Sequence, residues 1–242
     1  MTDEPTTPDL GTILGVWAHP DDETYLSAAL MARGVREGRR VTCVTATRGE
    51  EGSWDEERWP TATMGKIRDA ELMRSLEILG VTDHRWLDYY DGTCADVDQE
   101  EATDKVEAIL REVDPDTVLS FGPDGMTDHP DHKRTCAWAT EAFQRAAKPG
   151  ARLYYACMTP EWAAEFVPVM NRFNVFMSDD TPPVAPRSEL AIVYELDDDE
   201  LEQKLLAIDA HESQVEGMMN AFGRDFFRRA HRVETFRLAG TK

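Results

Sequence analysis

The sequence predicts an α/β fold: one domain with a Rossmann-like, mostly parallel sheet and helices on both faces. Apolar β-branched runs alternate with amphipathic segments along most of the 242 residues, as in parallel sheets whose crossover helices cover both faces. At about 150 residues per domain, this length allows one or two domains, and a single α/β domain of this size is ordinary. We expect residues 1–10, which are acidic and contain proline, to be a disordered lead, and residues 11–242 to form the domain.

The first third of the chain predicts two strands and two helices. Residues 12–18 (TILGVWA) form a compact apolar run, which indicates a buried strand. A helix is expected over 24–38, with apolar residues on one side and a glycine at its end. The β-branched segment 40–47 predicts the second strand. A loop over 48–61 then leads to an amphipathic helix at 64–79, again followed by glycine.

The middle of the chain continues the alternation. A short strand is expected at 85–88 and a helix at 100–113. The run TVLSF at 117–121 is typical of a strand and leads directly into a loop rich in Gly, Asp and His. A helix over 133–147 and a strand over 153–157 follow.

The last third is predicted less regularly. Residues 161–173 favour a helix weakly, and 179–188 contain three prolines, which indicate a loop. A strand is expected at 190–195. The acidic first turn of 198–211 suits the positive end of a helix dipole. A final strand is expected at 232–238.

The composition argues against polyanionic and membrane-embedded partners. Asp and Glu number 47 against 26 Lys and Arg, which gives a formal net charge of −21. Such a surface repels phosphate backbones, so we expect no nucleic-acid partner. The sequence has no apolar run of 18 residues, so we expect no stable membrane insertion.

Location and cofactor class can also be predicted. The first residues lack the basic and apolar parts of a signal peptide, and the four cysteines form no CxxC pair. Free thiols fit a reducing compartment, so we expect a cytoplasmic protein. Neither GxGxxG after the first strand nor GxxxxGK[ST] occurs, so the usual dinucleotide and P-loop phosphate cradles are missing.

The first motif with evident chemistry is AHPDDE, directly after the first predicted strand. We expect Pro20 at the first helical position and His19 at the cap. The three-residue spacing then brings His19 and Asp22 to the same side of the turn. A neutral imidazole and a carboxylate suit zinc, whereas Asp21 points elsewhere and is free for other work.

The second motif, DHPDH, follows the strand predicted at 117–121. Pro130 again suits the first helical position, flanked by His129 and His132. Loops at the carboxyl ends of parallel strands can converge, and three protein ligands plus an open position make a catalytic zinc site. One such motif alone could be a helix cap with solvated acids, and the two histidines alone could be surface residues.

The two motifs resemble the signature of the LmbE/PIG-L family of zinc-dependent N-acetylglucosamine-type deacetylases. Weaker pieces agree, and they extend the resemblance to about residue 214: TRGEEG at 47–52, RDAEL at 68–72, DG at 91–92 and KLLAIDAHESQ at 204–214. The chain departs from the family at Asp128, where many members have glycine before HPDH. An extra negative charge there would bear on substrate choice.

The resemblance implies a zinc site, although another first-row divalent metal is compatible with an Asp ligand. The implied ligands are His19, Asp22 and His132. Asp21 corresponds to the general base that activates the water at the metal. His129 corresponds to the group that stabilises the oxyanion or protonates the leaving amine. The competing interpretation of His129 is a cap on the helix that begins at Pro130.

Further residues are candidates around this centre. Asp131 is a natural outer-shell residue that would orient one of the histidines. Arg68 is the best candidate to bind substrate hydroxyls, with a salt bridge to Glu71 as its alternative. Glu50 and Asp91 could contact a sugar, or could be solvated loop acids.

The expected function is that of a zinc-dependent hydrolase. It would remove an acetyl or similar acyl group from the amine of an amino sugar or its conjugate, a small-molecule partner. One alternative is an amidase or other hydrolase that acts on a thiol or sugar conjugate with the same metal site. A second is a non-catalytic metal- or sugar-binding module. The sequence leaves homo-oligomerisation and the particular N-acylated substrate open.

Overall fold

The computed structural model describes residues 8–177 and 184–240. Most of the lead expected at 1–10 and part of the loop expected at 179–188 therefore lie outside the described residues. Within them, Leu10 is already buried against the core. No helix in the described ranges is long and apolar enough to cross a bilayer.

The described chain forms a seven-stranded sheet in the order β3-β2-β1-β4-β5-β7-β6. The strands are β1 (Ile13–Trp17), β2 (Val41–Thr47), β3 (Asp83–Tyr89), β4 (Thr117–Ser120), β5 (Arg152–Ala156), β6 (Ile192–Glu195) and β7 (Val233–Leu238). Neighbouring strands from β3 to β5 are parallel, and β7 runs antiparallel to β5 and β6. The strand order reverses between β1 and β4, where ligands bind in open α/β sheets.

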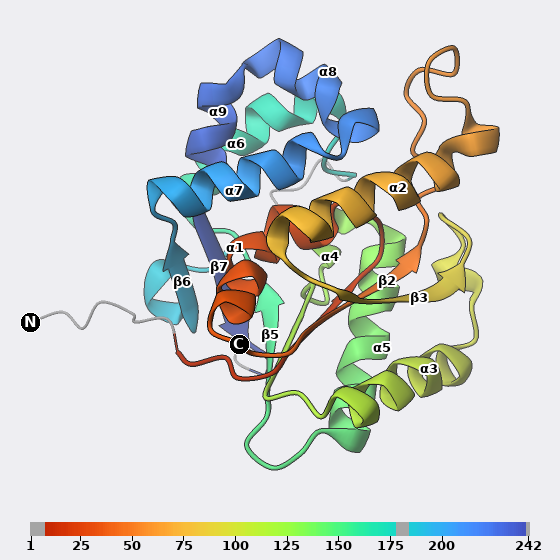
Figure 1. The fold of residues 1–242 in the computed structure, drawn as a ribbon, viewed down its shortest axis with the longest axis vertical. Coiled ribbons are helices and arrows are strands. Elements are labelled where there is room, and N and C mark those ends of the chain that lie inside the picture. Colours follow the sequence, from red (N-terminus) through yellow and green to blue (C-terminus); the bar gives the residue numbers. More distant parts are fainter. Residues whose placement is uncertain (1–7, 178–183, 241–242) are drawn as a thin grey trace, which may run out of the picture.

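Helices cover the sheet on both sides (Figure 1). They are α1 (Asp22–Arg36), α2 (Thr61–Leu79), α3 (Gln99–Val113), α4 (Gly125–Asp128), α5 (Pro130–Ala146), α6 (Pro160–Met170), α7 (Asp198–Asp209), α8 (Glu212–Phe222) and α9 (Arg224–Ala230). Helices α1, α2 and α7 pack together on one face, and α3 packs with α5 on the other. The predicted α/β architecture is confirmed.

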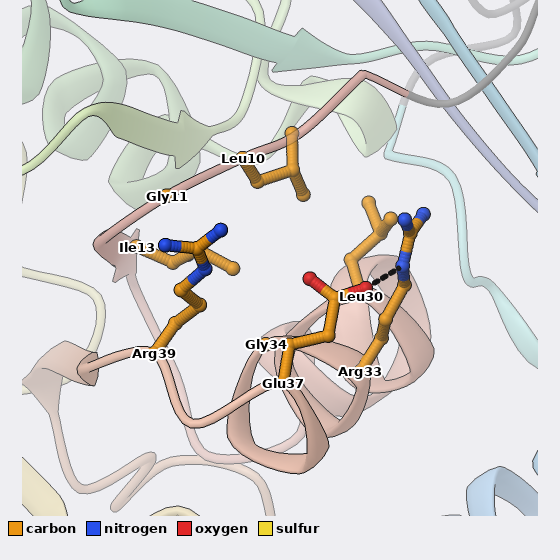
Figure 2. A pocket seen from close by; sticks show the side chains of 8 residues that line it. All are labelled: Leu10, Gly11, Ile13, Leu30, Arg33, Gly34, Glu37 and Arg39. Carbon is orange, nitrogen blue, oxygen red and sulfur yellow. Dashed lines mark hydrogen bonds and ion pairs between the residues drawn. The ribbon is translucent and has the colours of Figure 1, made fainter.

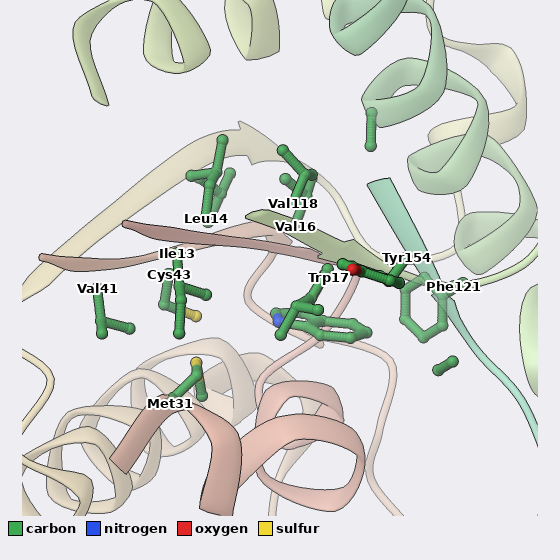
Figure 3. Close-up of a cluster of buried hydrophobic side chains, with 14 of the residues drawn as sticks. Ile13, Leu14, Val16, Trp17, Met31, Val41, Cys43, Val118, Phe121 and Tyr154 are labelled. Atoms are coloured by element: carbon green, nitrogen blue, oxygen red, sulfur yellow. The ribbon is translucent and has the colours of Figure 1, made fainter. Parts of the chain in front are cut away.

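The central strands are buried on both faces, which explains their continuous apolar sequences. In Figure 3, Leu14 and Val118 point to one side of the sheet, whereas Ile13 and Cys43 point toward Met31 of α1. All five residues of β1 are buried. A strand enclosed in this way cannot alternate polar and apolar side chains.

The largest departure from the predicted elements lies in the last third. The sequence predicts no element between 211 and 232, yet α8 and α9 fill this stretch. Gly223 separates them with φ 77, and α9 has only seven residues, too few to show a helical period. Their apolar residues join α6 and α7 in a second cluster that includes Phe166, Leu205 and Phe227.

The two HPD motifs begin their helices differently. In the second motif, Pro130 is the first residue of α5, as expected, and His129 is its cap, the role given above as the competing interpretation. In the first motif the expected placement is wrong, because α1 begins only at Asp22. Asp21 precedes it with φ 113, which turns the chain between Pro20 and the helix.

A buried ion pair joins three elements beneath the sheet's antiparallel edge. Lys204 on α7 lies 2.7 Å from Glu234 on β7, and both side chains are almost fully buried. Lys204 also donates to the Tyr25 carbonyl, and Glu234 accepts from the Ala29 and Leu30 N–H groups. The pair therefore satisfies polar backbone groups of α1 as well as the charge of each partner.

We predict that Lys204→Met lowers the free energy of unfolding by about 3–5 kcal/mol, because it leaves the Glu234 charge buried without its partner. Urea denaturation measures this loss. The double variant Lys204→Met/Glu234→Gln should recover much of it, since Gln still accepts a backbone hydrogen bond without a charge. A single variant as stable as the wild type would contradict the role assigned to the pair.

Candidate metal centre

The residues of both motifs meet at the carboxyl ends of β1 and β4, where the strand order reverses. His19 follows β1 by two residues and Asp22 opens α1. His132 lies in the first turn of α5. All three are buried, at 6–7% of their full exposure. The sheet topology thus brings together residues more than a hundred positions apart.

Three donor groups converge at a spacing suited to one metal ion. His19 Nδ1 lies 3.1 Å from His132 Nε2. The two Asp22 oxygens lie 3.7 Å from His19 Nδ1 and 3.4 Å from His132 Nε2, one oxygen facing each ring. Ligand atoms about 2.0–2.1 Å from a tetrahedral zinc are roughly 3.3–3.4 Å apart. The His132–Asp22 distance matches this spacing, the His19–His132 distance is somewhat shorter and the His19–Asp22 distance somewhat longer.

His132 is oriented by groups behind it. Its Nδ1 lies 2.9 Å from the Gly125 carbonyl oxygen, so Nδ1 carries the proton and Nε2 keeps its lone pair for the site. The ring stacks on Phe121, with centroids 4.1 Å apart. A backbone carbonyl that fixes the tautomer of a metal-binding histidine is a recurrent arrangement.

The opposite edge of His19 faces two carboxylates. Its Nε2 lies 3.0 Å from Asp91 and 3.3 Å from Asp131. Asp131 is fully buried and also accepts from the Gly92 and Cys94 N–H groups. Burial alone would lower the pKa of His19, but Asp131 and Asp91 raise that pKa to about 10. The site thus favours positive charge at this point.

Two groups of three side chains have ligand atoms that all lie within 4.8 Å of one another: His19 with His129 and His132, and His19 with Asp91 and Asp131. In the second, Asp131 already receives two backbone N–H groups, which suits a carboxylate that orients His19 through Nε2. The Nδ1 side remains free for the grouping with Asp22 and His132.

His129 lies beside the centre and also caps a helix. Its ring centroid is 4.7 Å from that of His19 and 4.9 Å from that of His132. Its Nδ1 accepts from the Asp131 N–H at 3.1 Å, which leaves the proton of the neutral ring on Nε2. Burial and the neighbouring His19 and His132 lower the pKa of His129 to about 4. The neutral ring is therefore the form present at neutral pH.

Asp21 adjoins the donors without belonging to them. Its carboxylate lies 3.1 Å from Arg68 Nη2. Burial raises the pKa of Asp21 to about 6, although the Arg68 guanidinium opposes the shift. A carboxylate with a raised pKa is a stronger base than an exposed one and is still ionised at neutral pH.

The three residues predicted to contact substrate, Arg68, Glu50 and Asp91, have different surroundings. Asp91 is buried in the site and its backbone N–H donates to Glu50. Arg68 is only 4% exposed and donates to the Gly49 and Pro20 carbonyls as well as to Asp21. The alternative of an Arg68–Glu71 salt bridge is not what the structure shows.

Glu71 instead accepts from the backbone and hydroxyl of Ser213 on α8. Asp128, the departure from the family pattern, is exposed and pairs with Lys133 at 2.5 Å. Its negative charge is therefore partly balanced. Thr127, whose hydroxyl lies 3.3 Å from His132 Nδ1, is a site residue that the sequence analysis missed.

The pocket drawn in Figure 2 is separate from this centre. Leu10, Ile13, Leu30 and Gly34 line it, together with the Arg33–Glu37 ion pair. Ile13 begins β1, whereas His19 follows its end, so the two places lie at opposite ends of the strand. This pocket contains none of the motif residues.

Comparison with known proteins identifies relatives along the whole chain. A deacetylase from Thermobifida fusca, named 1D-myo-inositol 2-acetamido-2-deoxy-alpha-D-glucopyranoside deacetylase, is 32% identical over 93% of this chain and 92% of its own length. A relative of the same name from Streptomyces avermitilis is 37% identical over 58% of this chain. That alignment covers 55% of the relative, so the chain matches about half its length.

Solved structures show the same fold. The N,N'-diacetylchitobiose deacetylase of Pyrococcus horikoshii superposes with a TM-score of 0.67 at 23% identity, over 98% of this chain and 87% of the other. The 4-carboxy-2-hydroxymuconate hydratase of Pseudomonas putida superposes with a TM-score of 0.63 at 18% identity, over 96% and 98%. The fold therefore occurs with more than one chemistry.

The family profile described as GlcNAc-PI de-N-acetylase matches residues 14–143, which contain both histidine motifs and the site between them. Together with the relative aligned over nearly the full length, this match shows that the chain belongs to the PIG-L (LmbE-like) family.

Proposed function

We propose that this protein is a metal-dependent N-deacetylase that removes the acetyl group from a 2-acetamido sugar within a small conjugate. The observation that carries the proposal is the triangle of His19, Asp22 and His132, with the carboxylate of Asp21 beside it and paired to Arg68. The family supports the same reaction, since the matching profile is described as a de-N-acetylase.

His19, Asp22 and His132 would hold the metal, for which zinc is the first choice. The fit rests on their donor spacing and on the buried carboxylates that favour a cation. A bound zinc ion would supply Lewis acidity, which polarises the acyl carbonyl and lowers the pKa of water. Asp131 and Asp91 would keep the His19 ring in place through Nε2.

Asp21 would take the proton from the attacking water. Its ionised carboxylate at neutral pH and its fixed contact with Arg68 suit a general base. The Nε2–H of His129 would donate to the oxygen that becomes negative as the carbonyl is attacked, because Nδ1 is engaged in the helix cap. Because burial and the neighbouring histidines lower the pKa of His129, its ring would donate as a neutral group, and the proton held by Asp21 would pass to the amine as the C–N bond breaks.

Arg68 would act on Asp21 more than on substrate, because its guanidinium is buried and engaged. Asp91 and Glu50 remain candidates for the substrate side of the site. The names of the inositol-glycoside deacetylase and the chitobiose deacetylase have one chemical group in common, an N-acetylated 2-amino sugar. We therefore place that group at the metal and leave the attached moiety to experiment. A cytoplasmic location and homo-oligomerisation stay predictions.

The proposal predicts acetate release that depends on metal. The purified protein should contain about one zinc or other first-row divalent ion per chain by elemental analysis. It should release acetate and a free amine from a panel of N-acetylglucosamine conjugates, including an inositol glycoside and diacetylchitobiose. Chelation should abolish the release and zinc should restore it. Full activity of the chelated protein, or no acetate from any conjugate, would contradict the proposal.

The Asp21 assignment predicts a loss of turnover without loss of metal. Asp21→Asn keeps the shape of the side chain and tolerates positive φ, but removes the base. Turnover should fall by about 10²–10⁴, measured by steady-state acetate release. His132→Ala is the comparison, because it should lose the metal. Loss of metal from the Asp21 variant would instead make this residue a ligand.

The two roles of His129 separate in two variants. His129→Ala should lose both the donor and the cap, and the cap is worth about 0.5–2 kcal/mol of stability. His129→Asn keeps a good cap, so its melting temperature should stay close to that of the wild type. Both should lose about 10²–10³ in turnover if the ring stabilises the oxyanion. Full turnover in His129→Asn would mean that His129 acts only as the cap of α5.

A further inference from the structure

The backbone of Asp21 is held in an unusual conformation directly beside the metal centre. Its φ of 113 and ψ of −30 lie in a region that side-chain-bearing residues rarely adopt. Such a conformation persists only where the surroundings impose it, and it often marks a functional position. The contacts that impose it therefore fix the direction of the Asp21 carboxylate.

One of these contacts comes from Glu23, a residue with no role in the ligand set. Glu23 Oε2 accepts from the Asp21 N–H at 3.2 Å. Glu23 is fully buried at the start of α1. Its carboxylate thus closes a tight loop over Asp22 and holds the amide that the turn leaves without a helical partner.

The other oxygen of Glu23 is anchored from the far end of the chain. Glu23 Oε1 accepts from the Thr24 hydroxyl at 2.5 Å and lies 3.4 Å from His211 Nε2. His211 Nε2 also lies 3.2 Å from Thr24 Oγ1, which contacts Ser75 on α2 at 2.8 Å. Each of these side chains has zero exposure, and hydrogen bonds are stronger in such a low-dielectric interior.

The end of the turn after α7 and the first turn of α8 each contact the part of the molecule that carries Asp21 and Arg68. His211 reaches Glu23, and Ser213 binds Glu71 one turn along α2 from Arg68. Arg68 in turn contacts the Asp21 carboxylate. Only the connection through His211 and Glu23 is continuous to Asp21, because Glu71 and Arg68 share helix α2 without a contact between their side chains in the described structure. His211 and Ser213 both belong to the segment HESQ, none of whose residues is assigned to the metal site.

We propose that Glu23, anchored by His211, is a positioning residue that holds Asp21 in the conformation needed for proton transfer; this inference rests on the proposed function. Without the Glu23 carboxylate, Asp21 can relax to an ordinary backbone conformation. The Asp21 carboxylate would then lose its contact with Arg68 and its place beside the proposed metal ligands. His19, Asp22 and His132 would keep their own partners.

The test compares Glu23→Ala and Glu23→Gln with a matched control. Leu110→Ala empties a buried position on α3, on the opposite face of the sheet, and serves as a purely destabilising change. For each zinc-loaded variant, metal content, melting temperature, kcat and KM for an N-acetylglucosamine conjugate are measured.

Glu23→Ala should keep its metal and its KM, and its kcat should fall about 10- to 100-fold, the scale of a displacement near 1 Å. Glu23→Gln should recover most of the kcat, because its amide oxygen still accepts from Asp21. Leu110→Ala should lower the melting temperature without a comparable loss of kcat. Equal kcat losses in Glu23→Ala and Leu110→Ala, or loss of metal from Glu23→Gln, would overturn the proposal.

A crystal structure of Glu23→Ala gives a readout that needs no activity. The proposal expects Asp21 to leave φ near 113 and its contact with Arg68. Asp21 unchanged in that variant would overturn the positioning role. A wild-type protein that releases no acetate from any conjugate would count against the proposed function alone, because the Asp21 conformation would still be tested by the structure.

Discussion

The concentration of buried negative charge around His19 is the constraint from which the rest of the site follows. Its ring lies 3.0 Å from Asp91, 3.3 Å from Asp131 and 3.7 Å from Asp22. Carboxylates removed from water are costly unless a cation compensates them. Asp131 and Asp91 raise the pKa of His19 for the same reason, because they favour positive charge on its ring. A divalent ion at Nδ1 would compensate the same charge and fit the donor spacing.

The sheet topology brings these side chains together. Because β1 and β4 are parallel neighbours with crossovers in opposite directions, their following loops open toward each other. Cys94 and Gly92, which follow β3, reach the same point through Asp131. None of the described residues of the last third belongs to the proposed ligand set, yet His211 and Ser213 contact Glu23 on α1 and Glu71 on α2.

The sequence predicted the parts that have a strong local signal. Continuous apolar runs located the central strands, and Pro130 after His129 located the cap of α5. The start of α1 was predicted wrongly: the helix begins at Asp22, and the Glu23 carboxylate accepts from the Asp21 N–H in the turn before it. Glu23 is fully buried and contacts His211 from the far end of the chain, which no local pattern reveals.

The surroundings of the site were predicted only in part: Asp131 was expected to orient a histidine and lies against His19, but other contacts were missed. Arg68 could be seen as polar on an amphipathic helix, but only the tertiary structure shows that it is buried against Pro20 and Asp21. Helices α8 and α9 were not predicted, because α8 contains Gly217 and α9 is short. The contribution of Thr127 required the fold, since a lone threonine has no recognisable pattern.

The position of the metal tests the central claim most directly. Anomalous diffraction at the zinc edge, from crystals of the zinc-loaded protein, locates the ion without reference to activity. The account predicts one strong peak about 2.0–2.2 Å from His19 Nδ1, His132 Nε2 and an Asp22 oxygen, the range for such zinc ligands. A single peak between His19 Nε2, Asp91 and Asp131, or no peak at either place, would contradict it.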